Sequence, residues 1–295
     1  MTTVLVTGGD SFTGHYLQKV LAREGYDFAG TTMSNREASN LFQCDLTDQH
    51  QVDAMVRKVS PSYVIHLAGI SFAAHPDPLE LYKVNLIGTE NLLKSLSANA
   101  SGLRKVILAS TANVYGNPNI ECIDETVCPH PVNHYAGSKL AMEHMAGNWR
   151  AKLPLLVTRP FNYTGVGQHE KFLIPKIVSH FRRAAPNILL GNTNVARDFS
   201  DVRDVAESYC RLLTSDTDHE VVNICSGRLI SLSSIIEHCR EISGNTLQVE
   251  VNPEFVRPNE IEKLRGDNGR LMSAVGDIAF RPIEETLSWM LNSDA

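Results

Sequence analysis

The 295-residue sequence predicts an α/β fold with a doubly wound parallel sheet and a smaller α/β part toward the C-terminus. Two observations predict it. Short apolar runs alternate with longer helix-like stretches along most of the chain, which is the pattern of parallel strands joined by helices. The first apolar run begins at residue 3 and leads directly into a glycine-rich turn and an amphipathic stretch.

The first predicted strand, Thr3–Thr7, is followed by the turn Gly8–Gly14 and a helix. This order forms the dinucleotide fingerprint of a Rossmann-type sheet. Gly8 permits the tight turn, Gly14 permits close helix–strand packing, and amides at the helix start face a pyrophosphate. Ser11 stands where the middle glycine usually lies. An ordinary β–turn–α unit without a ligand is the alternative.

The second predicted strand, Asp27–Thr32, indicates which cofactor binds. An Asp or Glu at the end of this strand usually binds a free ribose 2′-hydroxyl. Here Thr32 takes that place and Arg36 follows, which favours a 2′-phosphate, because a guanidinium is a bidentate donor. We therefore predict NADP(H), with NAD(H) possible if Arg36 is only a solvated loop residue. Asp45 and Leu46 end the next strand and are expected to flank the adenine.

Further β–α units follow the second strand. We expect His66, which lies in the next of these strands, to be a packed residue rather than a catalytic one. A strand that runs into a small-residue turn is predicted at 63–69, and further strands are predicted at 105–109, 153–159 and 221–227. Helices are predicted at 79–96, 135–150, 172–181 and through Tyr209 and Leu213.

The sharpest chemical signal is Tyr135 and Lys139, which share one face of a helix because they are four residues apart. An ammonium beside a phenol favours the ionised phenol, so we expect Lys139 to lower the Tyr135 pKa. Thr111, which follows the strand 105–109, can hold the substrate oxygen that is protonated. This arrangement interconverts a carbinol and a carbonyl beside a hydride carrier.

The order and spacing of these segments resemble the extended short-chain dehydrogenases/reductases, of the nucleotide-sugar epimerase/dehydratase type. The resemblance covers nearly the whole chain. It is carried by Thr7-Gly8 with Gly14, Asp45-Leu46, His66-Leu67-Ala68-Gly69, Asn85, Ser110-Thr111, Val114-Tyr115-Gly116, Tyr135 with Lys139, Arg159-Pro160 with Asn162, and Arg197-Asp198-Phe199.

The resemblance implies roles for individual residues. The catalytic residues are Thr111, Tyr135 as general acid/base, and Lys139. Tyr115 is expected to pack near the site. The cofactor-binding residues are Gly8, Ser11, Phe12, Thr13, Gly14, Thr32, Arg36, Asp45, Leu46, Leu67, Ala68, Gly69, Asn85, Tyr135, Lys139 and Pro160. The substrate-binding residues are Ser71, Asn113, Asn162, Arg197, Arg257 and Glu260.

The C-terminal part is similar to the branch of the family that handles GDP-linked sugars. Arg257–Ile261 with Leu264 and Gly266-Asp267 resembles GDP-mannose 4,6-dehydratases and, most closely, GDP-4-keto-6-deoxy-D-mannose reductases. A diphosphate needs charge-assisted donors, which Arg197 and Arg257 can supply, although each could instead form a surface salt bridge. Val275-Gly276-Asp277 departs from the Leu-Gly-Trp usual in these relatives.

The residues after Thr111 narrow the reaction. Sugar dehydratases of this family carry a Glu, and epimerase-reductases a Cys, at the position of Asn113, and neither Asn113 nor Ala112 is a base. What remains is a ketoreductase or a 4-epimerase with retained NAD. The NADPH prediction favours reduction of a nucleotide-linked 4-keto-6-deoxyhexose. A catalytically inactive dinucleotide-binding sensor or partner-binding module is less favoured, because such relatives usually lack the Tyr and Lys.

The predicted NADP-binding domain comprises residues 1–162 with about 202–226, and the predicted substrate domain about 163–201 and 227–295. The net charge of −6 argues against nucleic-acid binding, and no apolar stretch is long enough to span a membrane. The chain leaves no room for a signal peptide before its first strand, so we expect a cytoplasmic enzyme. The six cysteines show no metal-binding spacing, and we expect no metal. The resemblance implies a homodimer through the helices at 79–96 and 135–150.

Overall fold

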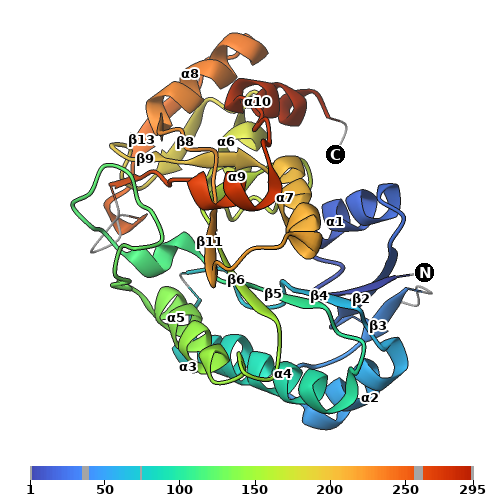
Figure 1. The fold of residues 1–295 in the computed structure, drawn as a ribbon. Coiled ribbons are helices and arrows are strands. Elements are labelled where there is room, and N and C mark those ends of the chain that lie inside the picture. Colours follow the sequence, from blue (N-terminus) through green and yellow to red (C-terminus); the bar gives the residue numbers. More distant parts are fainter. Residues whose placement is uncertain (1, 35–39, 74, 256–261, 294–295) are drawn as a thin grey trace.

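A central parallel sheet organises the computed structural model, which describes residues 2–34, 40–73, 75–255 and 262–293 (Figure 1). Its strand order is β11-β6-β5-β4-β1-β2-β3, and every neighbouring pair is parallel. The bounds are β1 Thr3–Thr7, β2 Asp27–Thr32, β3 Leu41–Gln43, β4 Tyr63–His66, β5 Lys105–Ala109, β6 Leu155–Pro160 and β11 Val221–Ile224. Strand order reverses beside β1, so the predicted doubly wound, Rossmann-type sheet is confirmed.

Both faces of this sheet are covered by helices. Successive strand residues point to opposite faces, so Val4 and Val6 enter one hydrophobic cluster and Leu5 the other. The first cluster is closed by α1 (Phe12–Arg23), α7 (Val202–Thr214) and α9 (Gly269–Val275). The second is closed by α2 (Gln49–Val59), α4 (Gly88–Asn99) and α5 (His134–Gly147). Apolar runs without alternation in the strands reflect this burial on both faces.

The long helix predicted at 79–96 is interrupted. It consists of α3 (Pro78–Tyr82), a single π-helical turn, η1 (Lys83–Ile87), and α4. Asn85 lies in this turn and is completely buried. A π turn inserts an extra residue into a helix, and such turns occur often at functional sites. The apolar periodicity that predicted one helix could not reveal the π turn, because α3, η1 and α4 follow one another without a break and a one-residue insertion hardly alters the period.

The smaller part of the molecule lies above the sheet in Figure 1, where α6 (Leu173–Arg182), α8 (Leu232–Ser243) and α10 (Ile283–Asn292) surround short strands. Phe181, Ile235 and Leu287 are fully buried in its separate core. Its strands pair as β8 (Asn187–Leu190) with β13 (Gln248–Val251), and β9 (Ala196–Arg197) with β12 (Ile230–Ser231) and β14 (Lys263–Leu264). The pair β7 (Asn162–Thr164) and β10 (Phe199–Asp201) lies at the junction with the sheet. Helix α9 falls within the predicted substrate domain, yet Leu271 packs into the core of the sheet.

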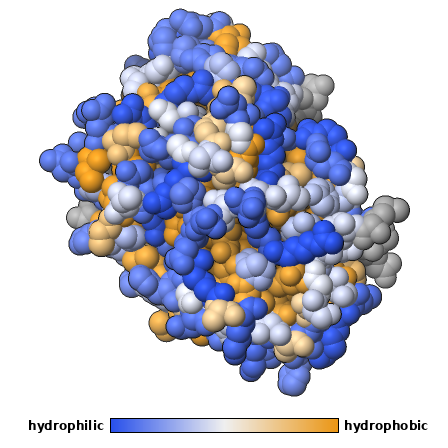
Figure 2. Space-filling view, viewed as in Figure 1, coloured by the Kyte–Doolittle hydropathy of each residue, from blue (hydrophilic) through white to orange (hydrophobic). Residues whose placement is uncertain are grey.

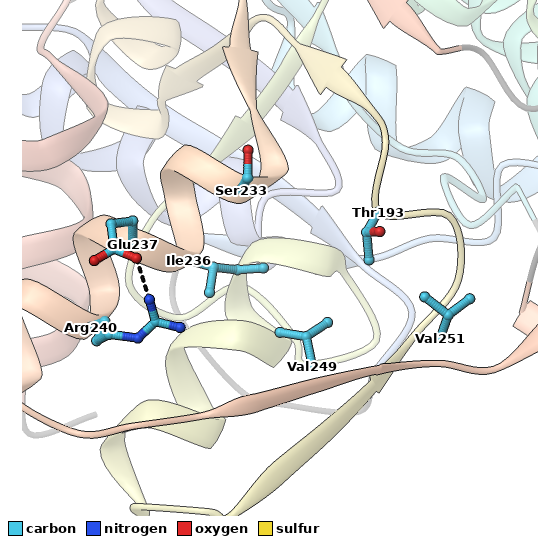
Figure 3. A pocket seen from close by; sticks show the side chains of 7 residues that line it. All are labelled: Thr193, Ser233, Ile236, Glu237, Arg240, Val249 and Val251. Atoms are coloured by element: carbon cyan, nitrogen blue, oxygen red, sulfur yellow. Dashed lines mark hydrogen bonds and ion pairs between the residues drawn. The ribbon is translucent and has the colours of Figure 1, made fainter.

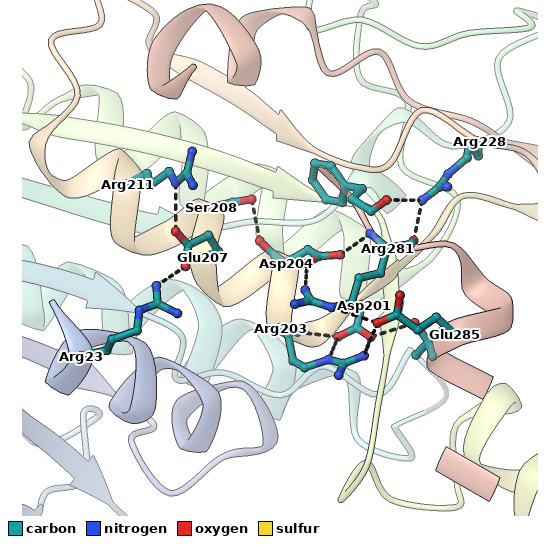
Figure 4. Close-up of polar contacts among 12 residues, drawn as sticks. Arg23, Asp201, Arg203, Asp204, Glu207, Ser208, Arg211, Arg228, Arg281 and Glu285 are labelled. Atoms are coloured by element: carbon teal, nitrogen blue, oxygen red, sulfur yellow. Dashed lines mark hydrogen bonds and ion pairs between the residues drawn. The ribbon is translucent and has the colours of Figure 1, made fainter. Parts of the chain in front are cut away.

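A buried carboxylate ties the two parts together at the start of α7 (Figure 4). Asp201 caps this helix by accepting from the Arg203 amide at 2.8 Å, and it also accepts from the Arg203 guanidinium at 2.9 and 2.6 Å. The Thr286 hydroxyl of α10 donates to the same carboxylate at 2.7 Å. One turn later, Arg281 pairs with Asp204. These contacts hold α10 against a helix that packs on the sheet.

On the face drawn in Figure 2, apolar residues gather near the centre and polar residues surround them. Over the part of the chain that the structure describes, no helix is both long enough and apolar enough to cross a bilayer.

We predict that Asp201→Ala lowers the free energy of unfolding by about 2–4 kcal/mol, since it removes a helix cap and leaves the buried Thr286 hydroxyl without its acceptor. Glu207→Ala is the control, because the side chains of its partners Arg23 and Arg211 are 58% and 43% exposed. That substitution should cost less than about 1 kcal/mol. Urea denaturation followed by circular dichroism measures both. Equal effects of the two substitutions would contradict the role of Asp201.

Candidate active site

The glycine-rich turn has the geometry that a dinucleotide pyrophosphate needs. Gly8 has φ of 70°, and a Cβ on Gly14 would lie 2.5 Å from the Gly9 carbonyl oxygen. Ser11 caps α1, because its hydroxyl accepts from the Gly14 amide at 3.1 Å. The serine at the middle glycine position therefore serves as the N-cap of α1. The positive end of α1 faces the carboxyl edge of the sheet, where a pyrophosphate binds in this fold.

The side chains of Phe12 and Thr13 contact Tyr163 of β7, which the sequence analysis did not single out. The Thr13 and Tyr163 hydroxyls lie 2.9 Å apart, and the Phe12 ring stacks on that of Tyr163 at a centroid distance of 6.2 Å. Burial raises the pKa of Tyr163. The only sequence signal for this residue was its position directly after Asn162. It connects the cofactor turn with the substrate side of the molecule.

At the end of β2, the structure adds a second residue that the sequence analysis missed. The buried Thr32 hydroxyl donates to Asp10 Oδ2 at 2.5 Å, and the Ser34 amide donates to Thr32 at 3.0 Å. Asp10 belongs to the glycine-rich turn, so a carboxylate does lie at this strand end, although it comes from another segment. Arg36, the predicted partner of a 2′-phosphate, lies outside the described residues.

Asp45 and Leu46, the two residues predicted to flank the adenine, form hydrogen bonds within the protein. Asp45 Oδ1 accepts from the Thr47 amide and hydroxyl, each at 2.8 Å. Leu46 is buried, and its carbonyl accepts from Asn91 of α4 at 2.9 Å. Both residues lie directly after β3, at the carboxyl edge where the cofactor was predicted.

The segment after β4 packs against the glycine-rich turn. The Leu67 and Ala68 amides donate to the Thr7 carbonyl and hydroxyl, each at 3.2 Å. A Cβ on Gly69 would lie 2.7 Å from Asn85 Oδ1 and 3.3 Å from Lys139 Nζ, so only glycine leaves room here. Leu67–Gly69, Asn85 and Lys139 thus meet at one place.

Asn85 holds this loop against α5. Its side chain accepts from the Ile70 amide at 2.8 Å and donates to the Ile70 carbonyl at 3.2 Å and to Ser138 at 2.9 Å. These contacts involve both ends of its amide group. Asn85 therefore holds the loop after β4 and α5 together, and its predicted role at the cofactor remains a prediction.

Thr111, Tyr135 and Lys139 are brought together as predicted. Asn133 caps α5, which puts Tyr135 in the first turn and Lys139 one turn later. The Thr111 side chain lies close enough to Tyr135 to lower the pKa of the phenol. Lys139 Nζ donates to the Ala109 carbonyl at the end of β5 at 2.8 Å. All three side chains belong to buried residues.

The sequence predicted a lowered pKa for Tyr135, whereas the structure raises it. Burial raises the pKa of Tyr135 to about 12, and the nearby Thr111 side chain offsets only part of this rise. Burial also lowers the pKa of Lys139 to about 8, against the attraction of Glu143. Desolvation penalises the charged form of both groups and is the largest cause of each shift. At neutral pH Tyr135 therefore carries its proton and is a proton donor.

His66 is a packed strand residue, as predicted. Its Nδ1 lies 2.6 Å from the Thr7 hydroxyl and its Nε2 lies 2.8 Å from the Thr89 hydroxyl. Burial lowers its pKa to about 3, so the ring is neutral. Tyr115 is likewise fully buried, and its hydroxyl donates to Asn223 at 2.8 Å.

The predicted substrate residues are only partly assembled. Asn113 lies half-buried in η2 (Ala112–Tyr115), Asn162 begins β7, and Ser71 is exposed. Pro160 ends β6 beside Ile224. Arg197 Nη1 donates to the Ala196 and Glu262 carbonyls at 3.0 and 2.7 Å. Arg257 and Glu260 lie outside the described residues.

Two pockets are lined by other residues. One of about 370 Å³ is lined by Thr193, Ser233, Ile236, Glu237, Arg240, Val249 and Val251 (Figure 3). Its two charged side chains pair with each other, as the dashed line shows. The second, of about 740 Å³, includes Arg228 and Arg265. Neither contains a predicted catalytic residue.

The cysteines can be examined for metal binding, because all of them lie among the described residues. All six cysteines are free thiols, four of them buried. Within the described ranges, no group of three or more His, Cys, Asp or Glu residues is placed to hold a metal ion.

Comparison with known proteins identifies the family of this site. The profile of the NAD dependent epimerase/dehydratase family matches residues 4–225. The GDP-6-deoxy-D-talose 4-dehydrogenase of Aggregatibacter actinomycetemcomitans is 35% identical, over 97% of this chain and 96% of its own length. The GDP-6-deoxy-D-mannose reductase of Pseudomonas aeruginosa is 33% identical, over 92% of this chain and 90% of its own length.

Solved structures agree along the whole chain. A candidate epimerase from Burkholderia cenocepacia J2315 has a TM-score of 0.92 and 42% identity, covering 99% of this chain and 97% of its own. RMD from Pseudomonas aeruginosa, complexed with NADPH, has a TM-score of 0.86 and 32% identity, covering 99% and 96%. With its glycine-rich turn and its Thr–Tyr–Lys cluster in the same fold, the chain belongs to the NAD-dependent epimerase/dehydratase family.

Proposed function

We propose that this protein reduces the C4 ketone of a nucleotide-linked 4-keto-6-deoxyhexose to the 4-hydroxy sugar, with a GDP-linked sugar as substrate and NADPH as reductant. The coarser statement, an NAD(P)-dependent enzyme of nucleotide-sugar metabolism, follows from the family and its relatives. The product would be a precursor for deoxysugar or polysaccharide synthesis.

One observation carries the proposal. A protonated, buried phenol lies beside the Thr111 hydroxyl and Lys139, while residues 112–114 contribute no ionisable side chain. Dehydration of the sugar would need a base near this position, and neither Ala112 nor Asn113 is one. The cluster can donate a proton to an oxygen and hold that oxygen by hydrogen bonds, which suits carbonyl reduction.

The residues divide the work as follows. Thr111 donates a hydrogen bond to the ketone oxygen, and Tyr135 transfers its proton to that oxygen as negative charge develops on it. Lys139 then stabilises the tyrosinate by its positive charge until solvent returns the proton. When bound, the nicotinamide supplies a hydride to C4, so that the carbonyl gains two electrons and two hydrogens in all.

The residues present fit a dinucleotide. The glycine-rich turn leaves no space for side chains at Gly14, and the loop after β4 leaves none at Gly69. The start of α1 would hold the pyrophosphate, and Lys139 the nicotinamide ribose. The NADPH preference rests on Thr32 and Arg36 and is supported by the relative bound to NADPH. Asp10 opposes a 2′-phosphate by its charge, so we expect NADH to serve as well.

The two named relatives point to C4. Their names contain 6-deoxy-D-talose and 6-deoxy-D-mannose, which are epimers at C4 and would arise from one 4-keto sugar by hydride addition to opposite faces. This supports a 4-keto-6-deoxy sugar as the shared substrate class. We also propose a cytoplasmic homodimer, and the exposed Leu79 and Ile87 near α3 and η1 are in line with pairing through these helices.

The reaction is tested by adding the product of a GDP-mannose 4,6-dehydratase and following NADPH or NADH absorbance. We expect oxidation of NADPH and a GDP-linked 6-deoxyhexose, whose C4 configuration is assigned by NMR. In a parallel reaction, the protein is incubated with UDP-glucose without added reductant, and epimerisation of the sugar is measured. Epimerisation of that sugar, with no oxidation of either cofactor by the keto sugar, would replace the proposed reduction with a 4-epimerase activity.

We predict that Tyr135→Phe lowers kcat by about 10²–10⁴-fold while the NADPH dissociation constant changes less than about twofold. The substitution removes the transferable proton and keeps the ring that fills the site. Steady-state kinetics measures kcat, and fluorescence titration with NADPH measures the dissociation constant. Unchanged kcat would exclude Tyr135 as the proton donor, and loss of both binding and turnover would indicate a folding defect.

We predict that Asp10→Asn raises the ratio of kcat/KM for NADPH to that for NADH by about tenfold or more, because a negative charge beside the 2′-phosphate is removed. Asparagine keeps an acceptor for Thr32. Asp27→Asn is the control, since it makes the same charge change at the opposite end of β2. An unchanged ratio for Asp10→Asn would place the ribose away from this carboxylate.

A further inference from the structure

A buried ion pair lies behind the catalytic cluster. Glu143 follows Lys139 by one turn of α5, and Arg159 lies near the end of β6. Arg159 Nε and Nη2 donate to the two Glu143 oxygens at 3.1 and 2.6 Å, and the side chains are only 7% and 8% exposed. This bidentate pairing fixes both side chains in one geometry.

The same carboxylate reaches the segment that carries the catalytic threonine. The Ser110 hydroxyl donates to Glu143 Oε1. Ser110 directly precedes Thr111, and its amide donates to the Thr158 carbonyl of β6 at 2.8 Å. Glu143 therefore connects α5, which carries Tyr135 and Lys139, with the strand end that carries Thr111.

Arg159 is anchored from the other side. Its guanidinium lies over the Tyr115 ring, 4.8 Å from the centroid. The Tyr115 hydroxyl donates to Asn223 of β11 at 2.8 Å. The chain of contacts thus runs from α5 through β6 to the edge strand of the sheet, and the position of Glu143 is set by packed, buried groups.

We propose that Glu143, held by Arg159 and Ser110, is a positioning residue that keeps Lys139 and Thr111 in their reactive arrangement. This inference rests on the proposed function, because the arrangement is reactive only toward the proposed ketone reduction. Buried ion pairs contribute little net stability compared with apolar groups of the same volume, so stability alone does not explain one at this place. Besides Arg159, Glu143 accepts from Ser110, the neighbour of Thr111, and its charge acts on Lys139, which a positioning role does explain.

The electrostatics gives a signature that a merely structural role would lack. The titratable or charged groups around Lys139 are Tyr135 and Glu143 on α5, neutral His66 on β4, and Arg159 on β6, which acts through Glu143. Glu143 opposes the effect of burial on the Lys139 pKa. Removing its charge should therefore lower that pKa further, while removing Arg159 should raise it, because Glu143 is then unneutralised.

The decisive experiment is an NMR titration of the ¹⁵Nζ resonance of Lys139, assigned by its loss in Lys139→Met. We expect the Lys139 pKa to fall in Glu143→Gln and to rise in Arg159→Met. Asp204→Asn is the matched control, since it neutralises a buried, arginine-paired carboxylate of α7, and it should leave the resonance unchanged. The titration needs neither cofactor nor substrate, so it stands even if the proposed reaction fails.

Turnover supplies the second readout. Glu143→Gln should lower kcat about tenfold or more, with KM changed less than about twofold, because misplacement of reacting groups affects the chemical step. Ser110→Ala keeps the ion pair and should lower kcat without moving the Lys139 pKa, which covers the case in which Glu143→Gln does not fold. Unchanged Lys139 titration in Glu143→Gln and Arg159→Met, or unchanged kcat in Ser110→Ala, would overturn the proposal.

Discussion

The structure depends on how closely α5 crosses the carboxyl ends of the parallel strands. Lys139 donates to the last carbonyl of β5, and Gly69 of the loop after β4 has no space for a Cβ beside Lys139 and Asn85. This close approach needs glycine in one element, a π turn in another and a well-capped helix in the third. If any one of them is displaced, the three groups Thr111, Tyr135 and Lys139 no longer share one place.

Burial is what gives these groups their chemistry. A phenol that is taken out of water keeps its proton, and an ammonium taken out of water binds its proton less tightly. The site therefore rests with Tyr135 as an acid, which suits delivery of a proton to a developing alkoxide. Glu143 and Arg159 balance the charge around Lys139 without exposing it to water, and their contacts extend this arrangement to the edge of the sheet.

Much of the fold follows from local patterns. The apolar strands, the glycine-rich turn and the pair Tyr135 and Lys139 are short-range features, so their type and order are readable along the chain. The π turn at Asn85 could not be predicted from the sequence, because a one-residue insertion hardly alters apolar periodicity. The position of Asp10 at the end of β2 could not be predicted either, because it depends on how two separate segments meet.

The sequence by itself determined the doubly wound sheet and the glycine-rich turn, and it pointed to Thr111, Tyr135 and Lys139 as the proposed catalytic side chains, since each depends on residue type and spacing within one segment. Only the tertiary structure decided the directions in which the Tyr135 and Lys139 pKa values shift and the partners of Glu143, Asp10 and Tyr163. Those properties depend on desolvation and on contacts between segments that are far apart in the chain. Spacing along a helix predicts which side chains share a face, but it does not predict how much water that face retains.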